Sequence, residues 1–128
     1  MLLLDTSVFL KVWLRPDEVS AKALREIGDD ANNVFVSSAT AWEIVVKHAV
    51  GKLELPGDPA LFVPRQIREA RFLQLPITID HALAVQQLPM HHADPFDRIL
   101  IAQAQFEGLT LVTTDKQLRR YDVRVMMA

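Results

Sequence analysis

The sequence predicts an α/β fold in which helices cover both faces of a mostly parallel sheet. The short apolar runs MLLL at 1–4 and VFVS at 34–37 have the length and composition of strands buried on both faces. Longer stretches between such runs carry apolar residues at helical spacing, and this alternation is typical of parallel sheets. A length of 128 residues fits a single domain spanning 1–128.

In the first half, the strand at 1–4 ends in Asp-Thr-Ser and is expected to lead directly into a helix. A second helix is expected at 17–27, where apolar side chains recur at helical spacing. A third helix at 38–51 follows the strand at 34–37. The second and third helices each end at a glycine, which favours the turn that closes a helix.

The middle of the chain is punctuated by prolines. The segment 58–73 begins with Asp-Pro, a cap followed by a favourable first helical residue, and Pro64 is expected to kink or divide its helix. Residues 75–78 are expected to form a short strand, and residues 79–88 a helix that stops before the next proline.

The last third contains the strongest helical pattern, from Pro95 to Glu107, which ends at Gly108. A strand at 109–115 and a short helical turn are expected next, followed by a final strand at 123–127.

Composition excludes several classes of protein. The net charge is -2, so the chain lacks the overall basic character of a protein that binds nucleic acid by bulk electrostatics. It has no cysteine, which excludes disulfides and thiolate metal sites. The apolar N-terminus has no basic segment before it, and no apolar run approaches the roughly 18 residues of a membrane span. We therefore expect a cytoplasmic protein with no membrane association.

Several acidic residues have simple structural explanations. Asp94 before Pro95 is a good helix cap, and Asp97 falls in the first turn, where a carboxylate interacts favourably with the helix dipole. Asp5 and Asp115 can cap the turns that they begin, and TAWE at 40–43 is a capping-box pattern. Taken singly, none of these acids requires a catalytic role.

The histidines do not predict a metal site. His91 and His92 are adjacent, so their side chains are expected to point in different directions and to lie in a solvated loop. His48 and His81 lack a partner at a spacing typical of zinc helices. Zinc is therefore not expected.

The shared position of four acids favours a catalytic site. Asp5, Glu43, Asp97 and Asp115 all lie at strand exits or near helix starts, and such positions converge on a crevice at the carboxyl edge of a parallel sheet. Clustered carboxylates repel one another unless a cation neutralises them. Oxygen-only ligands favour Mg²⁺ or Mn²⁺, and such ions support hydrolysis of phosphodiesters.

These motifs also resemble a known family. In order they are LLLDTSVFL, then SSATAWEIVVKHAVGKLEL, then the run from LPITIDHALAV through DPFDRILIAQAQ to LVTTD. In this order and over nearly the whole length, they resemble the PIN-domain ribonucleases, and most closely the VapC-like toxins of bacterial toxin–antitoxin pairs.

The resemblance implies a three-layer α/β/α sandwich with PIN-like topology. It also implies that Asp5, Glu43, Asp97 and Asp115 hold Mg²⁺ or Mn²⁺, with Asp94 as a possible further ligand. The implied activity is metal-dependent endonucleolytic cleavage of RNA. The implied partners are an RNA substrate, a cognate antitoxin protein and a second copy of the chain in a homodimer.

Further residues are assigned by the same resemblance. Thr6 and Thr113 correspond to small hydroxyl residues that support the acids. Ser7 stands where many relatives have histidine, a departure that leaves the four acids intact.

Arg98 and Lys116 each follow a site acid directly, and this adjacency makes them candidate RNA contacts.

Three alternatives remain open at this point. One is a stand-alone PIN-type nuclease that processes RNA, and another is a PIN-like module that binds RNA without cutting it. The third is an aspartate-based phosphatase, which needs a second acid two residues after the first. Ser7 occupies that position, so the phosphatase is the weakest alternative.

Overall fold

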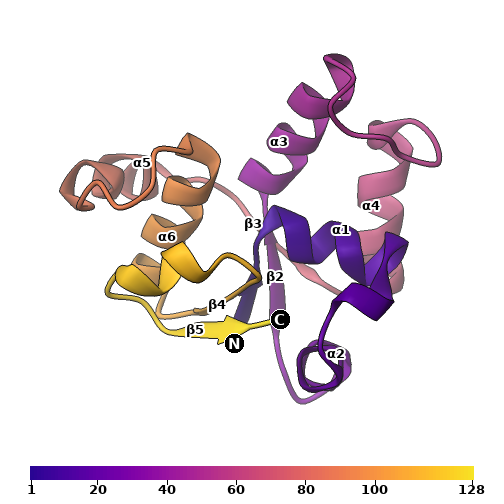
Figure 1. Cartoon of the computed structure of the whole chain (residues 1–128), viewed down its shortest axis with the longest axis horizontal. Helices are drawn as coiled ribbons and strands as arrows, with labels where there is room; N and C mark the ends of the chain where they lie inside the picture. Colours follow the sequence, from indigo (N-terminus) through magenta and orange to yellow (C-terminus); the bar gives the residue numbers. More distant parts are fainter.

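The computed structural model, which describes all 128 residues, is built on a five-stranded sheet (Figure 1). The strands, in chain order, are β1 (Leu2–Leu4), β2 (Val34–Ser37), β3 (Leu73–Leu75), β4 (Thr110–Thr113) and β5 (Val125–Met127). Their order in the sheet is β3-β2-β1-β4-β5, and all four pairings are parallel. The predicted α/β class is confirmed, and the sheet is wholly rather than mostly parallel.

Helices cover both faces of this sheet, as the three-layer prediction requires (Figure 1). They are α1 (Thr6–Leu14), α2 (Ala21–Gly28), α3 (Ser38–Ala49), α4 (Pro59–Glu69), α5 (Ile79–Ala84) and α6 (Pro95–Glu107). Alternate residues of β1 point to opposite faces. Leu2 and Leu4 join a core cluster with Phe9 of α1, whereas Leu3 joins a second cluster with Leu100 of α6.

Two strands are placed differently from the prediction. The strand expected at 75–78 lies at Leu73–Leu75, where it pairs with β2. It ends before Pro76, since proline has no N–H with which to continue a ladder. The final strand is limited to Val125–Met127.

The expected division of α4 does not occur, since Pro64 lies inside one continuous helix. Proline removes the bond that its N–H would have donated to the carbonyl of Ala60. Both residues are exposed, so water can satisfy that carbonyl.

Two other helices start or end differently from expectation. α2 starts only at Ala21, because the Ser20 side chain caps it by accepting a bond from the N–H of Ala23. The segment 79–88 forms the short α5 and then a 3₁₀ turn at Val85–Gln87.

The chain order places a topological switch at the middle of the sheet. From β1 the chain moves outward through β2 and β3, and it returns to the other side of β1 to form β4 and β5. β1 and β4 are therefore neighbours whose connections leave in opposite directions, and binding sites in parallel sheets form beside such a pair. None of the helices has the length and apolar character needed to cross a membrane.

Candidate functional site

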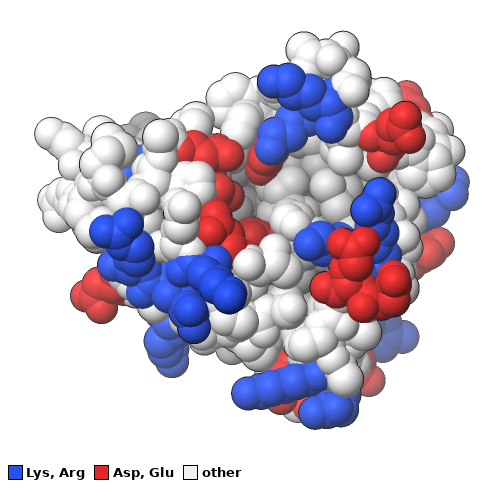
Figure 2. Space-filling model, viewed as in Figure 1, with Lys and Arg blue, Asp and Glu red and all other residues white.

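The four predicted acids reach one hollow at the carboxyl edge of the sheet. Asp5 directly follows β1, Asp115 lies two residues beyond β4, Glu43 is in the second turn of α3, and Asp97 is in the first turn of α6. The hollow has a volume of about 430 Å³, and Asp94 also lines it. Figure 2 shows acidic side chains gathered on one wall of this depression.

Asp5 is the most constrained of the acids. It is 4% exposed, and its Oδ1 accepts a 2.8 Å bond from the N–H of Val8 at the start of α1. Its Oδ2 accepts a bond from the hydroxyl of Thr113 at the end of β4. Burial raises the pKa of Asp5 to about 6, helped by the charges of Glu43 and Asp115, although these two hydrogen bonds act in the opposite direction.

The pKa of Asp97 is raised even further, to about 7. Burial is the main cause, and the negative charges of Asp94, Asp5 and Glu43 add to it. The nearby His92 acts the other way. Two carboxyls that resist ionisation in one hollow indicate a site that a bound cation would stabilise.

Glu43 is paired with the one cationic side chain among its helical neighbours. Its Oε2 forms an ion pair with Nζ of Lys47, one turn later in α3. Its Oε1 is buried and has no hydrogen-bond partner. The capping box expected at 40–43 is absent, because Ser37 caps α3 instead. The Glu43 carboxylate is therefore directed into the hollow rather than to the backbone.

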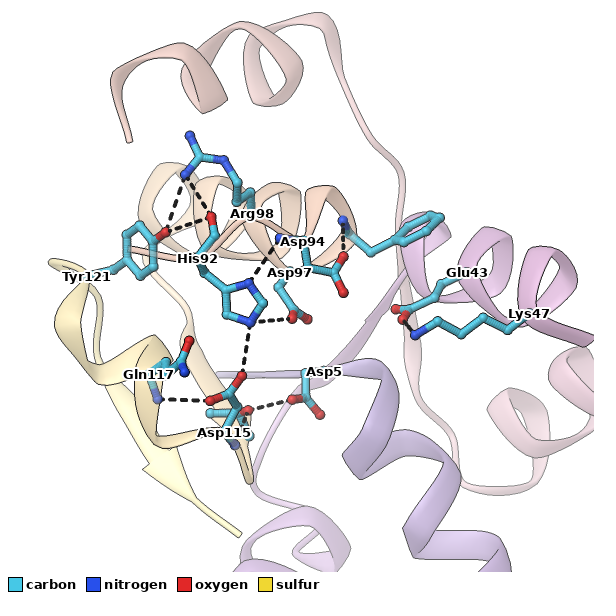
Figure 3. Close-up of polar contacts among 12 residues, drawn as sticks. Asp5, Glu43, Lys47, His92, Asp94, Asp97, Arg98, Asp115, Gln117 and Tyr121 are labelled. Atoms are coloured by element: carbon cyan, nitrogen blue, oxygen red, sulfur yellow. Dashed lines mark hydrogen bonds and ion pairs between the residues drawn. The ribbon is translucent and has the colours of Figure 1, made fainter. Parts of the chain in front are cut away.

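His92 belongs to this site, contrary to the expectation of a solvated loop histidine. Its Nε2 lies 3.3 Å from Oδ2 of Asp97 and 3.1 Å from Oδ2 of Asp115 (Figure 3). These three groups are close enough together to surround a metal ion. The sequence offered no signal for this role, since the loop that carries His92 has no periodic pattern.

The tautomer of His92 follows from its other nitrogen. Nδ1 accepts a 3.0 Å bond from the backbone N–H of Asp94. A neutral imidazole that accepts at Nδ1 carries its proton on Nε2. In this arrangement Nε2–H donates to the two carboxylates, so His92 positions Asp97 and Asp115 and leaves oxygen atoms as the available metal ligands.

The residues predicted to support the acids lie at or beside the hollow. Thr113 bonds Asp5 and also accepts a 3.0 Å bond from the N–H of Asp115. Thr6 lines the hollow, and its hydroxyl donates to that of Thr40 at 3.1 Å. Asp94 caps α6 through a 2.8 Å bond from the N–H of Phe96 while it also lines the hollow.

The prediction that Arg98 contacts RNA is wrong. Its side chain is buried, and its guanidinium donates to the carbonyls of Pro89 and Leu88 and to the hydroxyl of Tyr121. Successive residues of a helix point about 100° apart, so Arg98 faces away from the hollow that Asp97 enters. Lys116 is exposed at the start of the 3₁₀ turn Lys116–Arg120 and stays a candidate.

Most of the chain matches a known protein family. Residues 2–124 match the PIN domain. This chain belongs to the PIN-domain family. Its acidic hollow therefore lies in a PIN domain, at the carboxyl edge of the parallel sheet.

Particular PIN relatives give a finer comparison. Ribonuclease VapC16 of Mycobacterium tuberculosis is 35% identical over 72 residues, a stretch that spans 53% of this chain and 50% of that protein. The chain thus matches about half the length of this relative.

Two solved structures share the PIN fold over almost their full length. VapBC2 from Rickettsia felis, bound to a DNA fragment from their promoter, has a TM-score of 0.74 at 14% identity, covering 98% of this chain and 97% of that one. DNA-bound VapBC from Salmonella typhimurium has a TM-score of 0.70 at 18% identity, with 98% and 96% covered. At these identities the likeness establishes the fold alone.

Proposed function

We propose that this PIN domain is a metal-dependent endoribonuclease and the toxin of a toxin–antitoxin pair. The observation that carries the proposal is the convergence of Asp5, Glu43, Asp97 and Asp115 on one hollow. The local identity to a VapC ribonuclease supports RNA as the substrate class.

The residues of the hollow fit a hard divalent cation. Asp5 and Asp97 have raised pKa values, and Oε1 of Glu43 is a buried acceptor without a partner. Mg²⁺ and Mn²⁺ prefer such carboxylate oxygens, so we assign Asp5, Glu43, Asp97 and Asp115 as the candidate ligands, with Asp94 beside them. A bound ion of this kind would supply Lewis-acid chemistry for phosphodiester hydrolysis.

The chain's own residues prepare this site in defined ways. Thr113 fixes the carboxylate of Asp5, and His92 holds Asp97 and Asp115 close together through Nε2. Asp97, with a pKa of about 7, can keep a proton at neutral pH and release it when positive charge enters the hollow. The acids are thus held in place before any ligand binds, which reduces the ordering needed at binding.

The test is cleavage of a mixed RNA pool in the presence of Mg²⁺ or Mn²⁺. The intact protein should cut RNA, whereas Asp5→Asn and Asp97→Asn should lose nearly all activity. Asp122→Asn is the matched control, because Asp122 is exposed and lies outside the hollow. Equal cleavage by all four proteins would refute the assignment of these acids.

The proposal includes a protein antitoxin and a homodimer. The fold neighbours named above are VapBC complexes bound to DNA, which supports a DNA-binding antitoxin as partner. Dimer formation is supported by an apolar face on α3, where Trp42 is 62%, Val45 51% and Val46 38% exposed. Spacings of three and four residues place Val45 and Val46 on the same side of the helix as Trp42, and exposed apolar patches commonly mark interfaces.

A further inference from the structure

The acidic hollow also contains two lysines that the assignments above leave without a role toward substrate. Lys47 and Lys52 line it together with the acids. Lys47 is paired with Glu43, and its side chain is 42% exposed, so the ammonium lies between the buried carboxylate and solvent (Figure 3). Lys52 is exposed and makes no ion pair.

A second depression of about 420 Å³ continues the hollow along α1. The two share the lining residues Ser7, Leu10, Lys52 and Leu53, so they form one continuous groove, with Lys52 at the junction. The far part of the groove contains two further cations, Lys11 and Arg15, and one acid, Glu54. Figure 2 shows Lys and Arg side chains along the rim that faces the acidic wall.

The cations of this groove differ in availability. Lys11 and Arg15 both interact with Glu18, at 3.8 and 3.3 Å. Lys52 has no such partner, and Lys47 shares only Glu43, whose carboxylate a divalent ion would also attract. Lys47 and Lys52 are therefore the cations of the groove with the most capacity to bind another anion.

We propose that single-stranded RNA lies along this groove and that Lys47 and Lys52 bind its phosphates. Lys47 contacts the phosphate beside the acids, and Lys52 contacts the next part of the strand toward α1. This inference rests on the proposed ribonuclease function and names the surface that the substrate uses.

The electrostatics of the chain require such a surface. A polyanion that approaches several carboxylates on a chain of net charge -2 is repelled unless local cations offset the repulsion. The two positions predicted from adjacency do not line the groove: Arg98 is buried and Lys116 lies outside the lining of either depression. The lysines inside the groove supply the required charge at the point where the strand must pass.

The experiment measures binding of a short, labelled single-stranded RNA by fluorescence anisotropy over a range of salt concentrations with Mg²⁺ present. It uses Asp97→Asn protein, in which cleavage is expected to be blocked, and adds Lys47→Met or Lys52→Gln. Each added change should weaken binding at low salt on the order of fivefold. Each should also reduce the magnitude of the salt slope by about 0.7, the value for one phosphate contact on a single strand.

Lys22→Gln is the matched control, because Lys22 is an exposed lysine of α2 that lines neither depression. Its affinity and salt slope should equal those of the Asp97→Asn parent. If Lys47→Met and Lys52→Gln behave like this control, the groove is not the RNA path and the inference is overturned. Melting temperatures of all variants identify any loss caused by unfolding.

Metal binding gives an independent readout for Lys47. Removing its charge from beside Glu43 should tighten binding of Mn²⁺ alone, measured by calorimetry, while RNA binding weakens. Tighter Mn²⁺ binding with unchanged RNA binding would make Lys47 only a counter-ion and would refute its phosphate role. Failure of the nuclease proposal itself is seen separately, as wild-type protein that binds RNA through the lysines but does not cleave it.

Discussion

The hydroxyl of Thr113 donates a hydrogen bond to Oδ2 of Asp5, which joins the ends of β4 and β1 across 108 residues of sequence. Thr113 is fully buried, and its bond is the only hydrogen bond that Oδ2 of Asp5 accepts within the chain. The two central strands of the sheet are thus tied together at the site through a candidate metal ligand.

Replacing Thr113 with valine should therefore destabilise the protein. Valine keeps the shape and leaves a buried carboxylate oxygen without its donor, which costs about 1–3 kcal/mol of unfolding free energy. Thr113→Ser, which keeps the hydroxyl, should lose much less. Urea denaturation of both variants checks this, and a Thr113→Val protein as stable as wild type would contradict the role of the hydrogen bond.

His92→Ala should weaken binding of Mn²⁺, because the carboxylates of Asp97 and Asp115 lose the imidazole Nε2–H that holds them both in position. Loss of a residue that orients metal ligands typically lowers affinity or activity on the order of 10- to 100-fold. Calorimetric titration with Mn²⁺ measures the change. His91→Ala is the matched control, since His91 packs edge-on against Tyr121 and does not contact the acids. Similar affinities for both variants would contradict the positioning role.

The raised pKa values predict a specific pH dependence of stability without metal. Asp5 and Asp97 titrate at about 6 and about 7 in the folded protein, against an ordinary value of 3.8. Between about pH 4 and pH 7 the folded state therefore binds protons that the unfolded state does not, so these two groups make stability fall as pH rises. Asp97→Asn lacks one of these groups. Its stability relative to wild type should thus be higher at about pH 8 than at about pH 5, measured by urea unfolding with chelator. Parallel pH profiles would contradict the assigned pKa of Asp97.

Arg98→Met should destabilise the fold rather than act on substrate binding. The change leaves the buried carbonyl of Leu88 and the buried hydroxyl of Tyr121 without their donor, and we expect a loss of about 3 kcal/mol. Lys116→Gln, at an exposed position, should leave the unfolding free energy nearly unchanged. A stable Arg98→Met protein with weakened RNA binding would restore the original assignment of Arg98.

The apolar face of α3 predicts the state of association. The intact protein should have about twice the 14.5 kDa mass of one chain in light scattering, and Val45→Asp should reduce it to a single chain. Leu14→Asp, which alters an exposed leucine of α1, should not change the mass. Dissociation by both variants, or by neither, would place the interface elsewhere.

The convergence of the acids was predictable because it depends on topology. Asp5 and Asp115 follow parallel strands, and the ends of such strands necessarily share an edge of the sheet. His92 was not predictable in this way, since its contact with Asp115, 23 residues later in the sequence, depends on the path of the irregular loop that carries His92. Arg98 shows the opposite error, because adjacency to Asp97 along a helix was taken as proximity to the site. The orientation of consecutive helical side chains argues against that step.

The order of the elements along the chain also has a consequence for biosynthesis. β4 lies between β1 and β5 in the sheet but follows β1, β2 and β3 in the chain, so the central sheet and the acidic site both stay incomplete until β4 and Asp115 have been made. A ribosome that has made only the first hundred residues or so holds a chain without its second central strand and without one of its four acids. For an enzyme with the proposed activity, RNA cleavage therefore requires synthesis through Asp115, and chains interrupted before that residue should be inert toward the RNA around them.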